Sequence, residues 1–128
     1  MDSRRDDAAQ PPMPLNLRDT IRAAREADRT GAVRSLVSTD LNVNVVRLAQ
    51  GESIERHVNR EVDVLIIVLE GAGTLIIADQ THELQAGIAM MIPKESWRAI
   101  HAASDSDLAY VTCHRRRPGL FPTRPSQS

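Results

Sequence analysis

Residues 51–71 read GESIERHVNREVDVLIIVLEG, and residues 87–102 read GIAMMIPKESWRAIHA. Both stretches contain short runs rich in β-branched residues and bounded by glycine or proline, a pattern typical of β-strands separated by turns. The same pattern extends outward from them and predicts eight strands, over 33–38, 41–48, 53–57, 63–70, 74–78, 88–92, 97–102 and 107–114. Because no helical period lies between them, the sequence predicts an all-β fold, an antiparallel sandwich or small barrel.

Turn residues set the expected breaks between these strands. The triplet Gly71-Ala72-Gly73 is interpreted as a turn between two strands, and ADQTHEL over 78–84 as a turn that carries His82. His82 and His114 are each isolated in the sequence, so we expect both at the surface. Neither is expected to take part in a site.

The two ends of the chain differ from the strand-rich body. Residues 1–15 are polar and hold three prolines, which predicts a disordered arm, and the prolines after Arg117 predict a flexible tail over 118–128. The barrel is therefore expected over 31–117.

A helix is expected over 16–30, between the arm and the first strand. Asn16 can cap it, and Leu17, Ile21 and Ala24 fall on one face. This apolar stripe is thin, so we expect the helix to lie across the open end or edge of another element.

Composition narrows the class of protein. The chain has 128 residues, of which 41% are hydrophobic and 26% charged, as in one folded domain. Its single cysteine, Cys113, cannot form an internal disulfide. The N-terminus resembles no secretory signal and no apolar run is long enough to span a membrane, so a cytoplasmic protein without membrane contact is expected.

Charge is distributed unevenly along the chain. Residues 41–114 hold five basic and ten acidic residues, whereas residues 115–128 hold four basic residues and no acidic one. An acidic body argues against nucleic-acid binding, which depends on neutralising phosphates. The run from Arg115 to Arg117 is expected to fold back on the acidic body as a solvated tail, or to contact an acidic partner.

The two opening stretches resemble the two motifs of the cupin superfamily, small double-stranded β-helix barrels of the jelly-roll type. Gly51, His57 and Gly71 match the first motif at the family's spacing, and Gly87 and Pro93 match the second. The resemblance implies an antiparallel jelly-roll barrel over roughly 33–114. It also implies a homodimer, because small cupins commonly pair.

The positions that carry cupin chemistry differ from the family pattern. Asn59 stands at the second histidine of the first motif, Val64 at its glutamate, and Arg98 at the histidine of the second motif. His57 remains a good metal ligand, Asn59 is a weak one, and Val64 offers no donor atom. Arg98 has no lone pair and repels a divalent cation. The sequence therefore predicts no cofactor and no conventional metal site.

One alternative is a divalent transition metal held by unconventional ligands. His57 and Asn59 would need help from neighbours such as Glu61, Asp63 or His101. A one-residue shift along a strand turns a side chain to the other face, so this requires a change of register. The function in that case would be a metal-dependent enzyme of the dioxygenase or isomerase type.

The favoured hypothesis is a metal-free barrel that binds a small molecule. If Arg98 points into the barrel beside His57 and Asn59, it suits a small anionic ligand with a carboxylate or phosphate. The competing interpretation is that Arg98 pairs internally with Glu55 or Asp63. A third hypothesis is an interaction or scaffold module that uses the helix and the arginine run.

Overall fold

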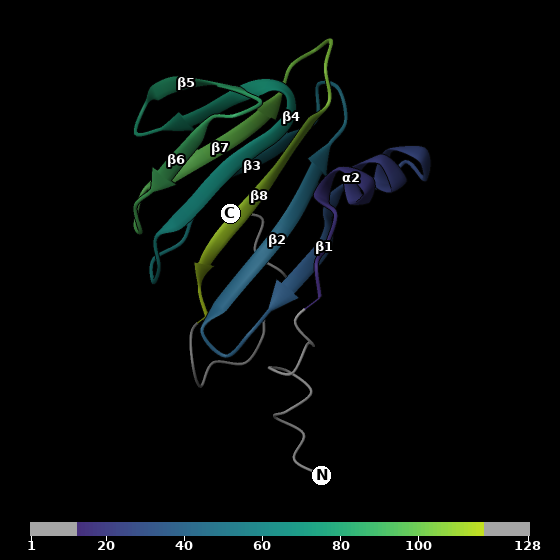
Figure 1. Ribbon diagram of the computed structural model, residues 1–128. Coiled ribbons are helices and arrows are strands. Elements are labelled where there is room, and N and C mark those ends of the chain that lie inside the picture. The colour runs from purple at the N-terminus through teal and green to yellow at the C-terminus, as the bar shows by residue number, and fades with distance from the viewer. Residues whose placement is uncertain (1–12, 117–128) are drawn as a thin grey trace.

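Eight antiparallel strands and one helix make up the part of the chain that the computed structural model describes, residues 13–116 (Figure 1). Most of the expected arm, the whole expected tail and Arg117 lie outside these residues. In chain order the elements are α2 (Leu17–Glu26), β1 (Gly31–Val37), β2 (Leu41–Leu48), β3 (Ser53–Val58), β4 (Val64–Ile77), β5 (Gln80–Gln85), β6 (Ala89–Ile92), β7 (Trp97–Ala102) and β8 (Leu108–Arg115).

The strands form two sheets that share β4. In the first sheet the order is β1-β2-β8-β4, with β6 also paired to β4; in the second, β4 pairs with β5 and β7, and β7 pairs with β3. Residues 64–71 of β4 pair with β8, and residues 73–77 pair with β7. This curled antiparallel arrangement confirms the predicted all-β jelly-roll barrel with a short N-terminal helix.

The predicted turn at Gly71–Gly73 is wrong, because β4 runs through it without interruption. At this corner β4 passes from one sheet to the other. Gly71 has a φ of +85°, and a Cβ atom built on it would lie 1.8 Å from the carbonyl oxygen of Asp107. A Cβ atom on Gly73 would lie 2.2 Å from the carbonyl oxygen of His101. The two glycines therefore allow backbones to approach closely and do not reverse the chain.

The predicted turn over 78–84 is also largely wrong, because most of it forms β5. Ala78 and Asp79 have positive φ angles of 50° and 68°, as in a two-residue hairpin connection, and β5 then pairs back along β4. His82 consequently lies in a strand and is partly buried. β2 and β7 have the predicted bounds, 41–48 and 97–102. Four other strands, β1, β3, β6 and β8, begin and end within two residues of the predicted bounds.

The helix packs on the outward face of the first sheet and not across an open end of the barrel. Its capping residue is the predicted one, since the Asn16 side chain accepts the backbone N–H of Asp19 at 3.0 Å. Ile21 and Ala24 are fully buried against Val45 of β2 and its neighbours on β8. The helix thereby completes a small second core outside the barrel.

The main core lies inside the barrel. Inward-facing aliphatic residues alternate along β2, β4, β7 and β8 with residues that face outward. Its buried members are Val46, Leu48, Val64, Ile66, Val68, Leu75, Leu84, Ile92, Ile100, Ala102, Leu108 and Tyr110. Between residues 13 and 116 there is no helix with the length and apolar character needed to cross a membrane.

Candidate functional site

One end of the barrel gathers most of the predicted site residues. The loop over 59–63 connects β3 to β4, and the loop over 93–96 connects β6 to β7, so both lie at this end. They are joined by a hydrogen bond from the backbone N–H of Glu95 to the carbonyl of Asn59, at 2.7 Å. The Asp63 carboxylate accepts a backbone N–H of the second loop at 2.9 Å. We call this end of the barrel the mouth.

Arg98 lies just inside the mouth, as the second residue of β7. It faces inward with Ile100, stands opposite His57 of β3 in the strand register, and is only 1% exposed. Its Nη1 donates to the Ser96 carbonyl at 3.2 Å, whereas Nε and Nη2 have no hydrogen-bond partner among residues 13–116. Burial lowers the pKa of Arg98 from its ordinary value. The guanidinium is therefore a buried group with three of its five N–H donors unmet within the described residues.

Internal pairing of Arg98 with Glu55 or Asp63 is not found. Within residues 13–116 no carboxylate lies within 4.0 Å of its guanidinium nitrogens. Asp63 is exposed in the loop, where it accepts a backbone N–H, and Glu55 is exposed on β3. The acidic residues of the body thus leave this cation without a partner.

His57 is half-buried beside Arg98. Its Nδ1 lies 2.9 Å from the carbonyl of Glu55, which can only accept a hydrogen bond, so Nδ1 carries the proton and Nε2 of the neutral ring is an acceptor. Burial lowers the pKa of His57; the Glu55 hydrogen bond opposes this shift and the charge of Arg98 adds to it. His57 is therefore a neutral imidazole at neutral pH.

Asn59 does not lie on the strand face shared by His57, contrary to the prediction. It follows the end of β3, and its carboxamide oxygen accepts the backbone N–H groups of Glu61 at 3.0 Å and Val62 at 3.2 Å. This is a side-chain turn that shapes the loop, typical of asparagine. Its oxygen is committed there, so Asn59 is no metal ligand in this arrangement.

The residues at the cupin ligand positions do not fit a transition metal. Val64 is buried in the apolar core, and Arg98 contributes only donors. His101 cannot substitute, because its Nδ1 lies 2.6 Å from the Ser53 hydroxyl, away from the mouth. Among the residues that the structure describes, no three His, Cys, Asp or Glu side chains are close enough to hold a metal ion.

The opposite wall of the barrel carries a row of polar side chains that was not predicted. Tyr110, Thr112 and His114 alternate along β8 on its inward face, and Asn42 of β2 is the register partner of His114. In the described part of the chain, four of their buried atoms have no hydrogen-bond partner: the Tyr110 hydroxyl, Thr112 Oγ1, His114 Nε2 and Asn42 Oδ1. We call these four residues the polar row.

The burial of His114 corrects a prediction. It is only 8% exposed, although its place next to the arginine run suggested the surface. The signal that could have found it is the two-residue period of Tyr110, Thr112 and His114 in a strand of otherwise apolar residues. The arginine run itself is only partly described: Arg115 is exposed, and Arg116 donates to the Ser38 carbonyl at 3.1 Å.

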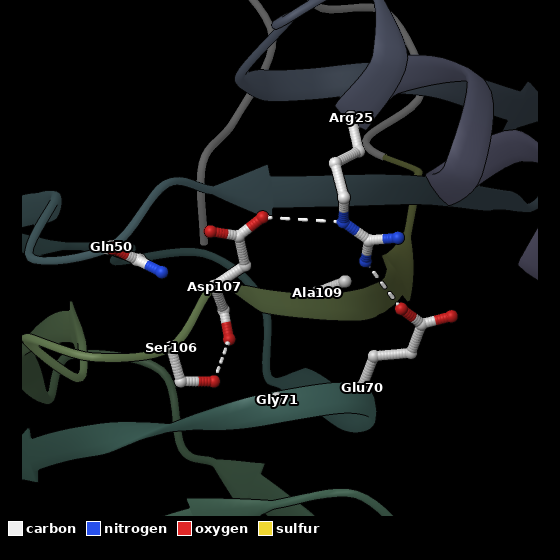
Figure 2. A pocket seen from close by; sticks show the side chains of 7 residues that line it. All are labelled: Arg25, Gln50, Glu70, Gly71, Ser106, Asp107 and Ala109. Atoms are coloured by element: carbon white, nitrogen blue, oxygen red, sulfur yellow. Dashed lines mark hydrogen bonds and ion pairs between the residues drawn. The ribbon is translucent and has the colours of Figure 1, made fainter.

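A hollow of about 330 Å³ lies outside the barrel, where the helix meets the first sheet. Figure 2 shows Arg25 extending from the helix to Glu70, at 2.6 Å, and to Asp107, at 3.4 Å. Arg47, 4% exposed, also binds the Asp107 carboxylate at 2.8 Å. Because these charges already pair with one another, this cluster fixes the helix in place and is the weaker candidate for a ligand site.

Asp107 makes the stability of this cluster depend on pH. Burial alone would raise the pKa of Asp107, but hydrogen bonds and charges from Arg47 and then Arg25 outweigh it, and the pKa is lowered. The lowered pKa of Asp107 stabilises the fold at pH values above the pKa of an aspartate in the unfolded chain, near 3.9. This stabilisation is lost as the pH falls through the pKa that Asp107 has in the folded protein.

We therefore expect Asp107→Asn to lower the free energy of unfolding at pH 7 by about 2 kcal/mol. The difference from the unsubstituted protein should shrink below about pH 4. Urea unfolding at a series of pH values measures it, with the exposed neighbour substitution Asp105→Asn as control. An equal loss at pH 7 and pH 3 would show that the charge of Asp107 does not matter.

The comparisons with known proteins agree with the fold. The family model described as "Cupin domain" matches residues 44–114. A cupin protein from Bacteroides fragilis is 27% identical, with a TM-score of 0.59 over 66% of this chain and 73% of that one. A protein from Bacillus halodurans is 20% identical, with a TM-score of 0.69 over 91% and 90% of the two chains.

A cupin-2 domain protein from Shewanella frigidimarina is 22% identical, with a TM-score of 0.63 over 80% of this chain and 94% of that one. No match was found among the curated proteins. The barrel, its two motifs and the family match define a small cupin domain. The chain belongs to the cupin superfamily.

Proposed function

We propose that this cupin domain binds a small anionic molecule inside the mouth of its barrel, with Arg98 as the principal contact. The observation that carries the proposal is the buried guanidinium, 1% exposed, whose Nε and Nη2 have no partner. An unpaired buried charge costs several kcal/mol, and this cost is offset when an anion binds to it. The site thus favours an anion over any neutral ligand.

The geometry of the unpaired edge favours a carboxylate or phosphate. Nε and Nη2 lie on the same side of the guanidinium, and their N–H groups point in parallel, as two oxygens of one anion require. His57 is the register partner of Arg98, and its lowered pKa means that it adds no second positive charge at neutral pH. The cation that holds the ligand is therefore the Arg98 side chain.

The apolar surroundings supply the rest of the ligand's contacts. Ile77 is the register partner of Arg98 on β4, and Ile92 and Val64 line the same end of the barrel. Such surfaces bury a carbon frame while a few polar groups fix its orientation, as in most small-molecule sites. The scaffold hypothesis leaves the buried, unpaired Arg98 without an explanation.

Thermal shift and calorimetric titration with a panel of small carboxylates and phosphate esters test the proposal. A ligand at one hundred times its Kd should raise the free energy of unfolding by about 2.7 kcal/mol, which raises the Tm by several degrees. Arg98→Met should abolish the shift, and Arg34→Met, which removes an exposed arginine on β1, should not. Ligand shifts that persist in Arg98→Met, or binding confined to neutral compounds, would overturn the proposal.

A further inference from the structure

We infer that the ligand is a hydroxylated carboxylate, whose carboxylate binds Arg98 while its hydroxyl groups bind the polar row on the opposite wall. The inference rests on the proposed function and deepens it by naming the class of ligand. The inference is carried by the four polar atoms on the inner face of β2 and β8 that have no partner in the described part of the chain. More than nine in ten buried polar groups in proteins have a partner, so such a row calls for one.

The outer part of the polar row, His114 with Asn42, lies at the same end of the barrel as Arg98. Val64, the first residue of β4 after the loop over 59–63, is the register partner of His114. Arg98 is the second residue of β7 after the loop over 93–96, and these two loops together form the mouth. Facing sheets pack about 10 Å apart, and side chains from both walls shorten that span. One compact ligand can therefore contact both walls.

The outer part of the row presents hydrogen-bond acceptors. His114 Nδ1 lies 3.0 Å from the Arg115 carbonyl, which can only accept, so Nδ1 is the donor, and in this tautomer Nε2 is an acceptor. The partnerless atom of Asn42, across the strand pair, is its carbonyl oxygen, also an acceptor. Two neighbouring acceptors need a donor such as a hydroxyl, and they repel a carboxylate, which is directed to Arg98 instead.

The inner part of the row can both donate and accept. The hydroxyls of Thr112 and Tyr110 are fully buried, and burial, with a smaller effect from the charge of Glu52, raises the pKa of Tyr110, so its phenol stays protonated. Alternate residues of a strand are about 6.6 Å apart, so Thr112 lies about that far inward from His114, and Tyr110 lies further in, toward Glu52 at the other end of the barrel. Successive hydroxyls on a chain of several carbons can meet Asn42, His114 and Thr112 in turn. A simple fatty acid would leave all of them unpaired.

The test compares three probes of equal chain length by calorimetric titration. Gluconate has a carboxylate and hydroxyls, hexanoate has only the carboxylate, and sorbitol has only the hydroxyls; galactonate, an epimer of gluconate, guards against a mismatch of stereochemistry. We expect an aldonate to bind the protein at least about tenfold more tightly than hexanoate, because each hydroxyl pairs a buried polar group. Sorbitol should bind undetectably, because it has no carboxylate to pair with Arg98.

Variants separate the two walls of the site. Thr112→Val and His114→Phe should reduce aldonate affinity toward that of hexanoate and leave hexanoate binding unchanged, whereas Arg98→Met should abolish binding of both acids. Thr81→Val, at an exposed position of β5, is the matched control.

Equal affinities for aldonate and hexanoate, both dependent on Arg98, would overturn this inference and leave the proposed function intact. If neither these acids nor any in the wider panel binds through Arg98, both fail. If Thr112→Val or His114→Phe does not fold, the comparison of the probes on the unsubstituted protein still tests the inference.

Discussion

Replacing Gly71 with alanine is expected to lower the free energy of unfolding by about 3 kcal/mol. An alanine at a φ of +85° costs roughly 1 kcal/mol in backbone strain. Its methyl group would also collide with the Asp107 carbonyl oxygen at 1.8 Å, and forcing these backbones apart adds about 1–3 kcal/mol. The collision lies at the corner where β4 passes between the sheets, so little room exists for relaxation. Urea unfolding followed by circular dichroism measures the loss.

The chain offers a matched control for the cost of placing an alanine at a positive φ. Gly51 has a φ of +73°, but a Cβ atom built on it meets nothing within 4 Å. Gly51→Ala should therefore lose only about 1 kcal/mol, and the difference between the two variants isolates the close approach. If the two variants lost equal stability, the contact with Asp107 would have no role in shaping the corner.

Arg98→Met is expected to stabilise the ligand-free protein by about 1–4 kcal/mol, although it abolishes ligand binding. Within the described part of the chain, the buried charge of Arg98 has one hydrogen bond, to the Ser96 carbonyl, and no carboxylate partner. Methionine removes that charge and fills similar space. The gain should appear as a higher urea midpoint with an unchanged slope.

A second buried arginine provides the opposite case. Arg47 is 4% exposed and binds Asp107 at 2.8 Å and the Arg29 carbonyl at 3.0 Å. Arg47→Met breaks a partnered charge and should destabilise the protein by about 3 kcal/mol. Destabilisation of similar size by Arg98→Met would mean that the free protein already satisfies Arg98, which would remove the basis of the anion site.

Much of the barrel could be predicted because its strands have a clear period of two. The strands over 41–48 and 97–102 match the prediction, since each alternates inward and outward residues and ends at turn residues. The corner at Gly71–Gly73 could not be predicted from local sequence, because glycine serves a turn and a close backbone approach equally well. Only the distant Asp107 carbonyl distinguishes the two. β5 was missed because Leu84 is its only buried residue.

The candidate site was predicted in part. The resemblance to the two cupin motifs placed His57 and Arg98 in one barrel mouth, and the two residues are register partners on β3 and β7. Asn59 was misplaced because β3 ends one residue earlier and its side chain turns to the loop. The polar row was missed because the nearness of Asn42 to His114 depends on a pairing between β2 and β8, some seventy positions apart. Such pairing cannot be derived from composition or local period.

The position of β8 in the first sheet also determines when, during synthesis, that sheet can close. Although β8 comes last among the described strands, it lies in the middle, between β2 and β4. While residues 108–115 are still inside the ribosome, the facing edges of β2 and β4 expose unpaired backbone groups beside apolar side chains. Such edges invite pairing with other chains. The first sheet of this barrel can therefore close only after residues 108–115 have been synthesised.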